Sequence, residues 1–172
     1  MRMICSWTRQ QKKRPKIKQL ESLALTAARE AGLPDSTHIS IVFLPDVRMA
    51  ELNEDALNHH GPTDVICFDL RSSEIPGLEN IPDGNAEEEI ADDIEIYVCP
   101  DVAAREAEKR NLPYPDEVIL YLVHGLLHAS GEDDLVPEKK RIMRRRERQV
   151  MTALRKQYDF ERIFAGASPV SL

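Results

Sequence analysis

The segment that most constrains this chain reads HGLLHASGEDD, from His124 to Asp134. Two histidines spaced four residues apart lie on the same face of a helix, one turn from each other. Gly131 can adopt the left-handed backbone conformation that ends a helix and reverses the chain. A carboxylate three residues further on then turns back towards the histidines. The pattern therefore predicts a helix that ends at Gly131 and an open three-ligand metal site formed by His124, His128 and Asp134, with Asp133 as the neighbouring alternative.

The types of ligand in this pattern indicate which metal it would bind. Two neutral imidazoles and one carboxylate suit Zn²⁺, and three protein ligands leave a fourth position for water, as in catalytic zinc sites. The alternative is structural: histidines at the edge of a core, followed by a solvated acidic helix end. Metallopeptidases with the HExxH motif place their general base directly after the first histidine, where this chain has Gly125. The glycine disfavours a peptidase and leaves room beside the metal for a larger substrate.

Hydrophobic periodicity and turn residues predict an α+β fold with a small mixed sheet of about four strands and about five helices, the metal site lying at the end of one helix. Runs rich in β-branched residues predict strands, and apolar residues at helical spacing, bounded by Gly and Pro, predict helices. Asp116 is the expected cap of the histidine-bearing helix. The expected strands are 38–44, 64–70 and 93–99, with 3–7 as a weaker fourth, and the expected helices are 17–31, 46–58, 101–111, 117–130 and 137–158.

The chain length of 172 residues and a hydrophobic content of 42% favour one domain over residues 1–172. Residues 72–93 contain eight acidic side chains and no basic one, so the rest of the chain carries about one positive charge of a net −7. We expect a long solvated loop at 72–92 and a short C-terminal tail at 159–172.

The predicted last helix carries a dense cluster of basic side chains. Such a cluster is either an ordinary solvated face or a surface that binds phosphate groups. The candidates for RNA binding are Lys139, Lys140, Arg141, Arg144 and Arg145.

The cysteines and the apolar runs bear on where the protein resides. Cys5, Cys67 and Cys99 form no CxxC pair and lie in strand-like runs, which favours reduced core residues and a cytoplasmic protein. No apolar stretch is long enough for a signal peptide or a membrane span, so no membrane association is expected.

Four segments, in order along the chain, resemble one known family. HGLLHASGEDD is similar to the HGxLHLxGYDH signature of the YbeY family, the metal-dependent endoribonucleases that act as ribosomal RNA maturation factors. GPTDVICFDL (61–70) resembles the PTDVLSFP strand of that family, IEIYVCPDVAAREA (94–107) resembles its GDIVICPEVAxxEA, and ISIVFLPDVRMAELN (39–53) resembles its first strand and helix. The resemblance is strongest over residues 38–155.

This resemblance implies a fold, an activity and partners. The fold is a small α+β domain with a mixed sheet of about four strands. The activity is cleavage of single-stranded RNA, notably maturation of the 3′ end of small-subunit ribosomal RNA, together with ribosome quality control. A zinc-bound water would act at the phosphodiester. The implied partners are ribosomal RNA and the small ribosomal subunit, and the implied cofactor is one zinc ion, without an organic cofactor.

The chain departs from the family pattern at two positions near the site. The family ligands fall on His124, His128 and Asp134, and the last of these is usually a histidine. Leu57 stands where many members carry an arginine that would contact the phosphate. His59 or His60 would then be a substitute donor, or both are surface loop residues.

Thr63 and Asp64 are expected to have a structural role at the start of a strand. Besides the endoribonuclease, two other functions remain open at this stage. One is a non-catalytic ribosome-assembly factor that binds RNA and is stabilised by metal, and the other is a metallopeptidase.

Overall fold

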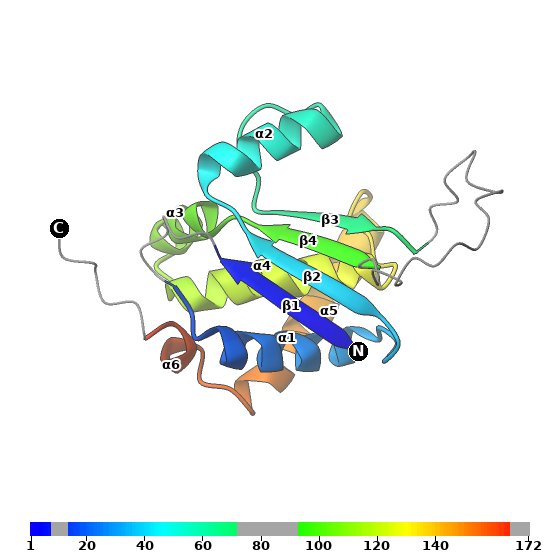
Figure 1. Cartoon of the computed structure of the whole chain (residues 1–172), viewed down its shortest axis with the longest axis vertical. Helices are drawn as coiled ribbons and strands as arrows, with labels where there is room; N and C mark the ends of the chain where they lie inside the picture. The colour runs from blue at the N-terminus through cyan, green and yellow to red at the C-terminus, as the bar shows by residue number, and fades with distance from the viewer. Residues whose placement is uncertain (8–13, 72–92, 166–172) are drawn as a thin grey trace, which may run out of the picture.

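A mixed four-stranded sheet is the framework of the part of the chain that the structure, a computed structural model, describes: residues 1–7, 14–71 and 93–165. The strand order is β1-β2-β4-β3, with β1, β2 and β4 parallel and β3 antiparallel to β4. In chain order the elements are β1 (Arg2–Trp7), α1 (Ile17–Ala31), β2 (His38–Phe43), α2 (Asp46–Leu57), β3 (Val65–Asp69), β4 (Ile94–Val98), α3 (Pro100–Arg110), α4 (Tyr114–Ala129), α5 (Pro137–Arg155) and α6 (Phe160–Phe164) (Figure 1).

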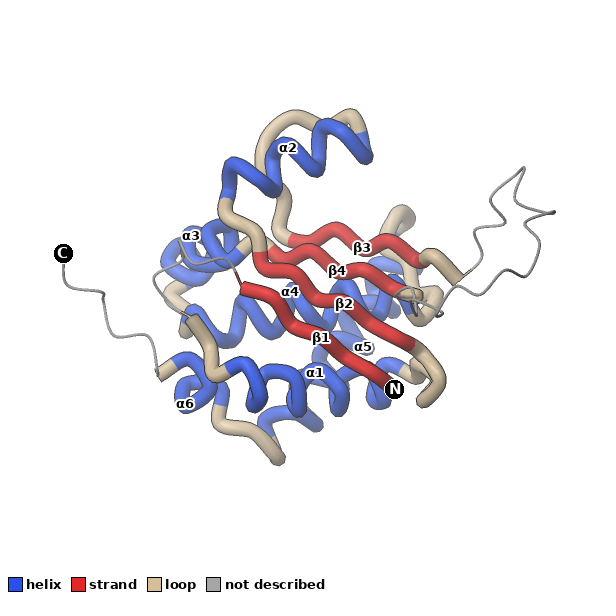
Figure 2. The backbone as a smooth tube through the Cα atoms, in the orientation of Figure 1, coloured by secondary structure: helices blue, strands red, loops and turns tan. Residues whose placement is uncertain are grey.

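The predicted α+β class, with four strands in a mixed sheet, is confirmed. Helices α1, α4 and α5 lie on one face of the sheet (Figure 2). Side chains alternate between the two faces of a strand, and in β2 and β4 every second one is buried. Ile41 and Ile96, neighbours in the β2–β4 register, are fully buried beneath the helices. The main core therefore lies between the sheet and this helical layer.

Helix α4 is the centre of the molecule, because it contacts α1, α3, α5, α6, β3 and β4. It begins at Tyr114, with Pro115 in its first turn, and it has no side-chain cap. Pro is favoured in a first helical turn because its missing N–H has no partner there in any case. The expected cap at Asp116 is therefore wrong: Asp116 lies inside the first turn and forms an ion pair with Arg155 of α5.

Gly125 is the point of closest approach between α4 and the sheet. A Cβ atom at this position would lie 2.8 Å from Cγ2 of Ile96 and 3.1 Å from Cγ2 of Val65. The expectation that this glycine leaves room for substrate is therefore wrong, since its open side faces the core. Its function is helix–sheet packing.

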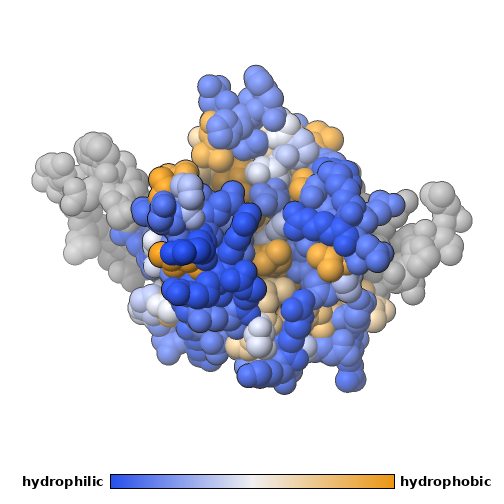
Figure 3. Space-filling view, turned by 180° about the vertical axis from the view of Figure 1, so that it is seen from behind, coloured by the Kyte–Doolittle hydropathy of each residue, from blue (hydrophilic) through white to orange (hydrophobic). Residues whose placement is uncertain are grey.

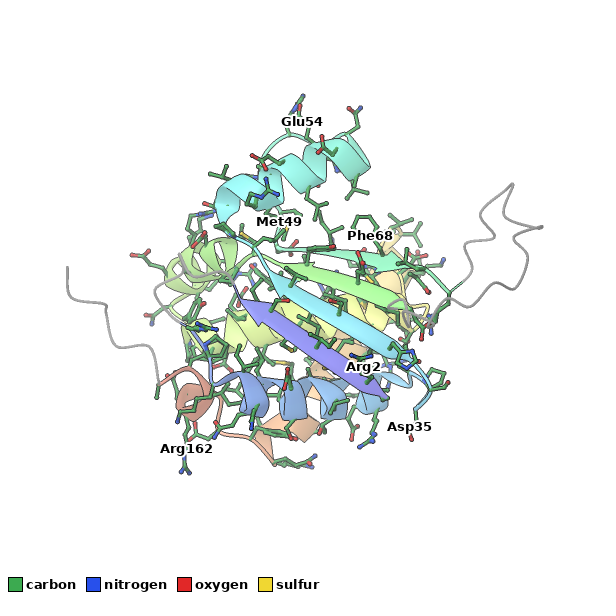
Figure 4. The ribbon with its side chains drawn as sticks, in the orientation of Figure 1. Arg2, Asp35, Met49, Glu54, Phe68 and Arg162 are labelled. Atoms are coloured by element: carbon green, nitrogen blue, oxygen red, sulfur yellow. The ribbon has the colours of Figure 1, made fainter. Side chains whose placement is uncertain are left out.

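Helix α2 lies away from the main helical layer, above the β3 edge of the sheet (Figure 1). Met49 of α2 packs with Ile66 and Cys99 in a small second cluster, to which Phe68 also contributes (Figure 4). Alternate residues of β3 thus serve two layers, because Val65 and Cys67 contact the main core instead.

The C-terminal region corrects one expectation. Residues 160–164 of the expected tail form α6, and Phe160, Ile163 and Phe164 are buried. The hydrophobic side chains explain the difference, because they pack against the first turn of α4, where the Phe164 ring meets that of Tyr114 edge-on at 5.6 Å. The expected acidic loop at 72–92 lies outside the described residues. Among the described helices, none has the length and apolar character needed to cross a membrane.

Candidate metal centre

The two histidines of α4 converge on one point at its C-terminal end. Nε2 of His124 and Nε2 of His128 are 2.9 Å apart. Both side chains are partly exposed, with 22% of His124 and 32% of His128 accessible. They are therefore neither buried core residues nor freely solvated ones.

The other ring nitrogens show how the imidazoles are oriented. Nδ1 of His124 lies 2.7 Å from Oε1 of Glu147 on α5, and Nδ1 of His128 lies 3.0 Å from the backbone oxygen of Glu132. An Nδ1–H that donates to an oxygen leaves Nε2 with a lone pair, which is the usual arrangement of histidines that bind metal. Two lone pairs this close repel each other unless a cation lies between them, so the donor set fits a metal ion.

The turn after α4 places the third ligand. Gly131 has φ +97°, and the N–H groups of Gly131 and Glu132 donate to the carbonyls of His128 and Leu127 at 2.9 and 3.0 Å. These two bonds form a Schellman motif, which ends the helix and reverses the chain. Oδ1 of Asp134 consequently lies 3.8 Å from Nε2 of His128.

Ligand atoms of His124, His128 and Asp134 all lie within 4.8 Å of one another. The structure thus brings together the three residues that the sequence predicts as ligands. The alternative ligand, Asp133, is engaged elsewhere, since its carboxylate accepts from the N–H of Leu135 and pairs with Lys139.

The electrostatics of His124 reflect two opposing effects. Burial lowers the pKa of His124, but the hydrogen bond to Glu147 and the negative charges of Glu147, Asp64 and Asp134 raise it, and the result is a pKa above the ordinary value. The surroundings of this imidazole therefore favour a positive charge, whether a proton or a metal ion supplies it.

Two of the three ligands, His124 and Asp134, border a cavity of about 290 Å³ whose wall is partly polar and partly apolar. Its lining includes both carboxylates and cations. A phosphodiester bound at the metal ion would therefore lie close to side chains of both charges. The residues that line it are Asp64, Arg110, Leu120, Tyr121, His124, Asp134, Lys140, Met143, Arg144 and Glu147.

The predicted RNA-binding residues of α5 separate into two groups. Lys140 and Arg144 line the cavity. Lys139 instead pairs with Asp133, and Arg141 and Arg145 are exposed away from the cavity. The helix therefore turns only part of its basic surface towards the candidate site.

The loop histidines lie apart from the centre. The described residues that line the cavity include neither His59 nor His60, and His60 is 86% exposed, with Nδ1 3.3 Å from Glu54. Leu57 ends α2 and is also exposed. This arrangement favours the surface-loop interpretation.

The structure also contains residues of the site that the sequence analysis missed. Asp64 has the expected local role, because its carboxylate accepts from the N–H of Val65 at 2.9 Å, but it also lines the cavity. Glu147 and Arg110 come from α5 and α3. The sequence offers one indication of a role for Glu147, which is that it is a single acid within the basic run RRRERQ.

A second group of candidate ligands, Asp46, Cys99 and Asp101, has a structural explanation. Asp46 pairs with Arg105 through both carboxylate oxygens, and Asp101 accepts from the N–H of Asp46 at 3.0 Å. Burial raises the pKa of the Cys99 thiol to about 12, so it stays protonated. These contacts hold the start of α2 against α3.

Comparison with known proteins identifies the family. The model of the family Endoribonuclease YbeY matches residues 5–155. The chain belongs to the YbeY endoribonuclease family. The match begins at β1, well before residue 38, so the YbeY pattern also includes β1 and α1. The signature residues discussed above all lie within it.

Individual YbeY relatives agree with this assignment. Endoribonuclease YbeY of Syntrophotalea carbinolica is 28% identical over 160 residues, which are 92% of this chain and 99% of the relative. Endoribonuclease YbeY of Salinispora tropica is 36% identical over 125 residues, covering 71% and 77%. A solution structure from Thermotoga maritima shares the fold, with a TM-score of 0.52 and 21% identity over 90% of this chain and 91% of that one.

Proposed function

We propose that this chain is a zinc-dependent endoribonuclease that cuts single-stranded RNA in the cytoplasm, matures the 3′ end of small-subunit ribosomal RNA and takes part in ribosome quality control. The main support is that ligand atoms of His124, His128 and Asp134 converge on one point. His124 and Asp134 line a cavity that Lys140 and Arg144 also line. Membership of the YbeY family supports the activity, and the free thiols of the described cysteines are compatible with a reducing compartment.

Each residue of the site has a distinct task in this proposal. A zinc ion held by the three ligands would supply a Lewis acid and lower the pKa of a water molecule towards ~7. Glu147 holds the ring of His124 in the orientation that exposes Nε2. Lys140 and Arg144 offset the negative charge of the RNA backbone, which would otherwise be repelled by Asp64 and Asp134.

The third ligand, Asp134, determines the rate of RNA cleavage that we expect. A carboxylate in place of a neutral imidazole adds a negative charge beside the phosphate and makes the ion a weaker acid catalyst. We therefore expect metal binding to be retained and cleavage to be slower than with histidine at this position. The variant Asp134→His tests this directly.

The experiment measures metal content and RNA cleavage together. Wild type, His124→Ala, His128→Ala, Asp134→Ala and Asp134→His are purified free of contaminating nuclease, assayed for bound metals by mass spectrometry and incubated with labelled single-stranded and double-stranded RNA. His60→Ala serves as the control, because that histidine is exposed outside the cavity. We expect the alanine variants of the ligands to lose zinc and cleavage together, and His60→Ala to retain both. Cleavage of RNA by His128→Ala at the wild-type rate would show that the assignment of the catalytic metal site is wrong.

A second candidate function is a non-catalytic ribosome-assembly factor that keeps the metal for stability. Asp134 favours it, because a carboxylate ligand retains the metal but weakens catalysis. That factor would bind zinc and RNA in the same assay without turnover in any variant. A metallopeptidase is disfavoured by packing, because a glutamate at position 125 would have to enter the space that Ile96 and Val65 occupy.

A further inference from the structure

A long groove continues from the metal cavity along the surface between α4 and α5. It has a volume of about 910 Å³, and it shares Arg110, Leu120, Arg144 and Glu147 with the cavity, so the two are contiguous. The residues found only in the groove are Leu112, Pro113, Asp116, Glu117, Arg148, Met151, Thr152 and Arg155. Figure 3 looks onto the helical side of the molecule and shows hydrophilic side chains around a recessed strip in which hydrophobic atoms are visible.

Helix α5 presents one regular row of side chains to this path. Lys140, Arg144 and Arg148 follow each other at intervals of four residues, and Thr152 and Arg155 continue the row. Four residues advance a helix by about 6 Å, and the row from residue 140 to residue 155 extends over roughly 22 Å. The path is therefore long enough for several nucleotides and begins at the metal ligands.

The other basic side chains of α5 have different surroundings. Arg146 donates to the backbone oxygens of Glu30 and Ala31 at the end of α1, both at 3.2 Å, and so connects two helices. Lys139 pairs with Asp133. Arg141 and Arg145 are exposed and line neither the cavity nor the groove.

Four arginines and three acids line the groove, so its net charge is positive, and each of the acids already has a partner. Glu117 is 1% exposed and lies 2.9 Å from Arg110, Asp116 pairs with Arg155, and Glu147 binds His124. Within the described residues, Arg144 and Arg148 form no ion pair with any acid. Two arginines are thus available for an anionic ligand.

We propose that this groove binds the single strand of RNA on one side of the bond that is cut, with Arg144 at the junction as the first phosphate contact and Arg148 as the next. The inference rests on the proposed function, because the strand in the groove is the one that enters the metal cavity. Leu112, Leu120 and Met151 provide an apolar wall for ribose and base faces, while the arginines follow the backbone. A positively charged groove that follows the backbone is typical of proteins that bind single strands without reading their sequence.

The test compares two variants of equal charge. Arg144→Gln with Arg148→Gln removes two cations from the groove, and Arg141→Gln with Arg145→Gln removes two cations from the same helix outside it. All four side chains are exposed, so both proteins should keep the wild-type circular dichroism spectrum and unfolding midpoint. Binding of a labelled 12-nucleotide single-stranded RNA to the metal-loaded protein is measured by fluorescence anisotropy at several salt concentrations, in the cold, with gels to verify that the RNA stays intact.

We expect the groove variant to bind about tenfold more weakly or worse, since each lost contact is a charge-assisted hydrogen bond. The slope of log affinity against log salt should become shallower by about 1.4, since each phosphate contact on a single strand contributes about 0.7. The matched variant should change affinity less than about threefold. Equal weakening in both variants would show that only overall charge matters, and no weakening in either would exclude the groove, so either result overturns the proposal.

Three further outcomes separate the alternatives. If a polyglutamate peptide binds as tightly as RNA and loses affinity in the same variant, the groove accepts an acidic protein segment and the RNA assignment is wrong. If the groove variant loses RNA binding while the wild-type protein shows no metal-dependent cleavage, RNA binding in the groove is supported and the proposed nuclease function is wrong. If the wild type cleaves RNA and the groove variant binds and cleaves RNA equally well, the proposal for the groove is wrong and the nuclease function is supported.

Discussion

At the scale of single residues, the orientation of His124 depends on a partner 23 positions away in sequence. The Glu147 carboxylate is only 16% exposed and accepts from Nδ1, so that Nε2 faces the other ligands. Carboxylates in this position fix both the ring orientation and the proton position of metal-binding histidines, and their loss typically weakens metal binding 10- to 100-fold. We regard Glu147 as a positioning residue.

Replacing Glu147 by Gln tests this role. The amide keeps an oxygen acceptor but removes the charge, so we expect zinc affinity to fall roughly tenfold while the fold is retained. Competition with a chromophoric chelator measures the affinity, and Glu138→Gln, an exposed acid at the start of the same helix, is the control. Unchanged affinity in the Glu147 variant would show that the contact does not support the metal.

At the scale of elements, α4 combines two functions because its sides face different surroundings. One side lies against β3 and β4 at Gly125, and another carries His124 and His128 towards α5 and the solvent. The close approach at Gly125 thus determines how far the histidines lie from the sheet. Glycine in a helix interior costs about 1 kcal/mol of helix propensity relative to alanine, which the packing offsets here.

Gly125→Ala should destabilise the protein in spite of that propensity. Placing a methyl group 2.8 Å from Ile96 Cγ2 forces the helix or the strand to shift, and overpacking of this kind costs about 1–3 kcal/mol. After the gain of about 1 kcal/mol in helix propensity, we expect a net loss of up to about 2 kcal/mol in the free energy of unfolding, measured with urea.

A double-mutant cycle separates the clash from other effects of Gly125→Ala. In an Ile96→Ala background the nearest obstructing methyl group is absent and only the 3.1 Å approach to Val65 remains, so the same substitution should cost less than in the wild type. An equal loss in both backgrounds would contradict the packing explanation.

At the scale of the whole molecule, the pKa values of the three cysteines show how well the packing of the helices on the sheet excludes water. They lie on or next to three different strands of the sheet. Burial is the main cause that raises the pKa of Cys5 and Cys99 to about 12 and that of Cys67 to about 11. All three thiols are free and protonated in the folded protein at neutral pH.

These shifts predict a loss of stability at alkaline pH. In the unfolded chain the thiols ionise near their ordinary pKa of 9.0, whereas in the folded protein they keep their protons until about pH 11–12. The unfolded state therefore binds fewer protons in this window, and the free energy of unfolding falls as pH rises from about 9. Below pH 9 the contribution is fully present.

Urea unfolding at pH 7, 8.5 and 10 measures the effect, and the reaction with iodoacetamide at pH 8.5 gives an independent check. We expect slow alkylation of the folded protein and fast alkylation in urea. Fast alkylation of all three thiols in the folded state at pH 8.5 would contradict the burial that raises these pKa values.

Much of the fold was predictable because its signals are local. Alternating β-branched residues predicted β2, β3 and β4, and the glycine and proline residues at their ends predicted α1 and α3 to within about a residue. The expectation of a tail after residue 158 was wrong, because the hydrophobic residues of α6 have a partner only once α4 is in place. The cap of α4 was misplaced because an acid in a first helical turn resembles one at the cap position.

By itself, the sequence determined the spacing of His124 and His128 on one helical face and the reversal at Gly131 that returns Asp134 to them, since helix periodicity and a left-handed glycine act within about ten residues. Only the tertiary structure decided that Glu147 orients His124, that Gly125 faces Ile96, and that Lys140, Arg144 and Arg148 of the basic helix face the cavity and groove. Those features depend on how α5 and the sheet pack around α4, and packing direction is a property of the assembled layers, which no local pattern encodes.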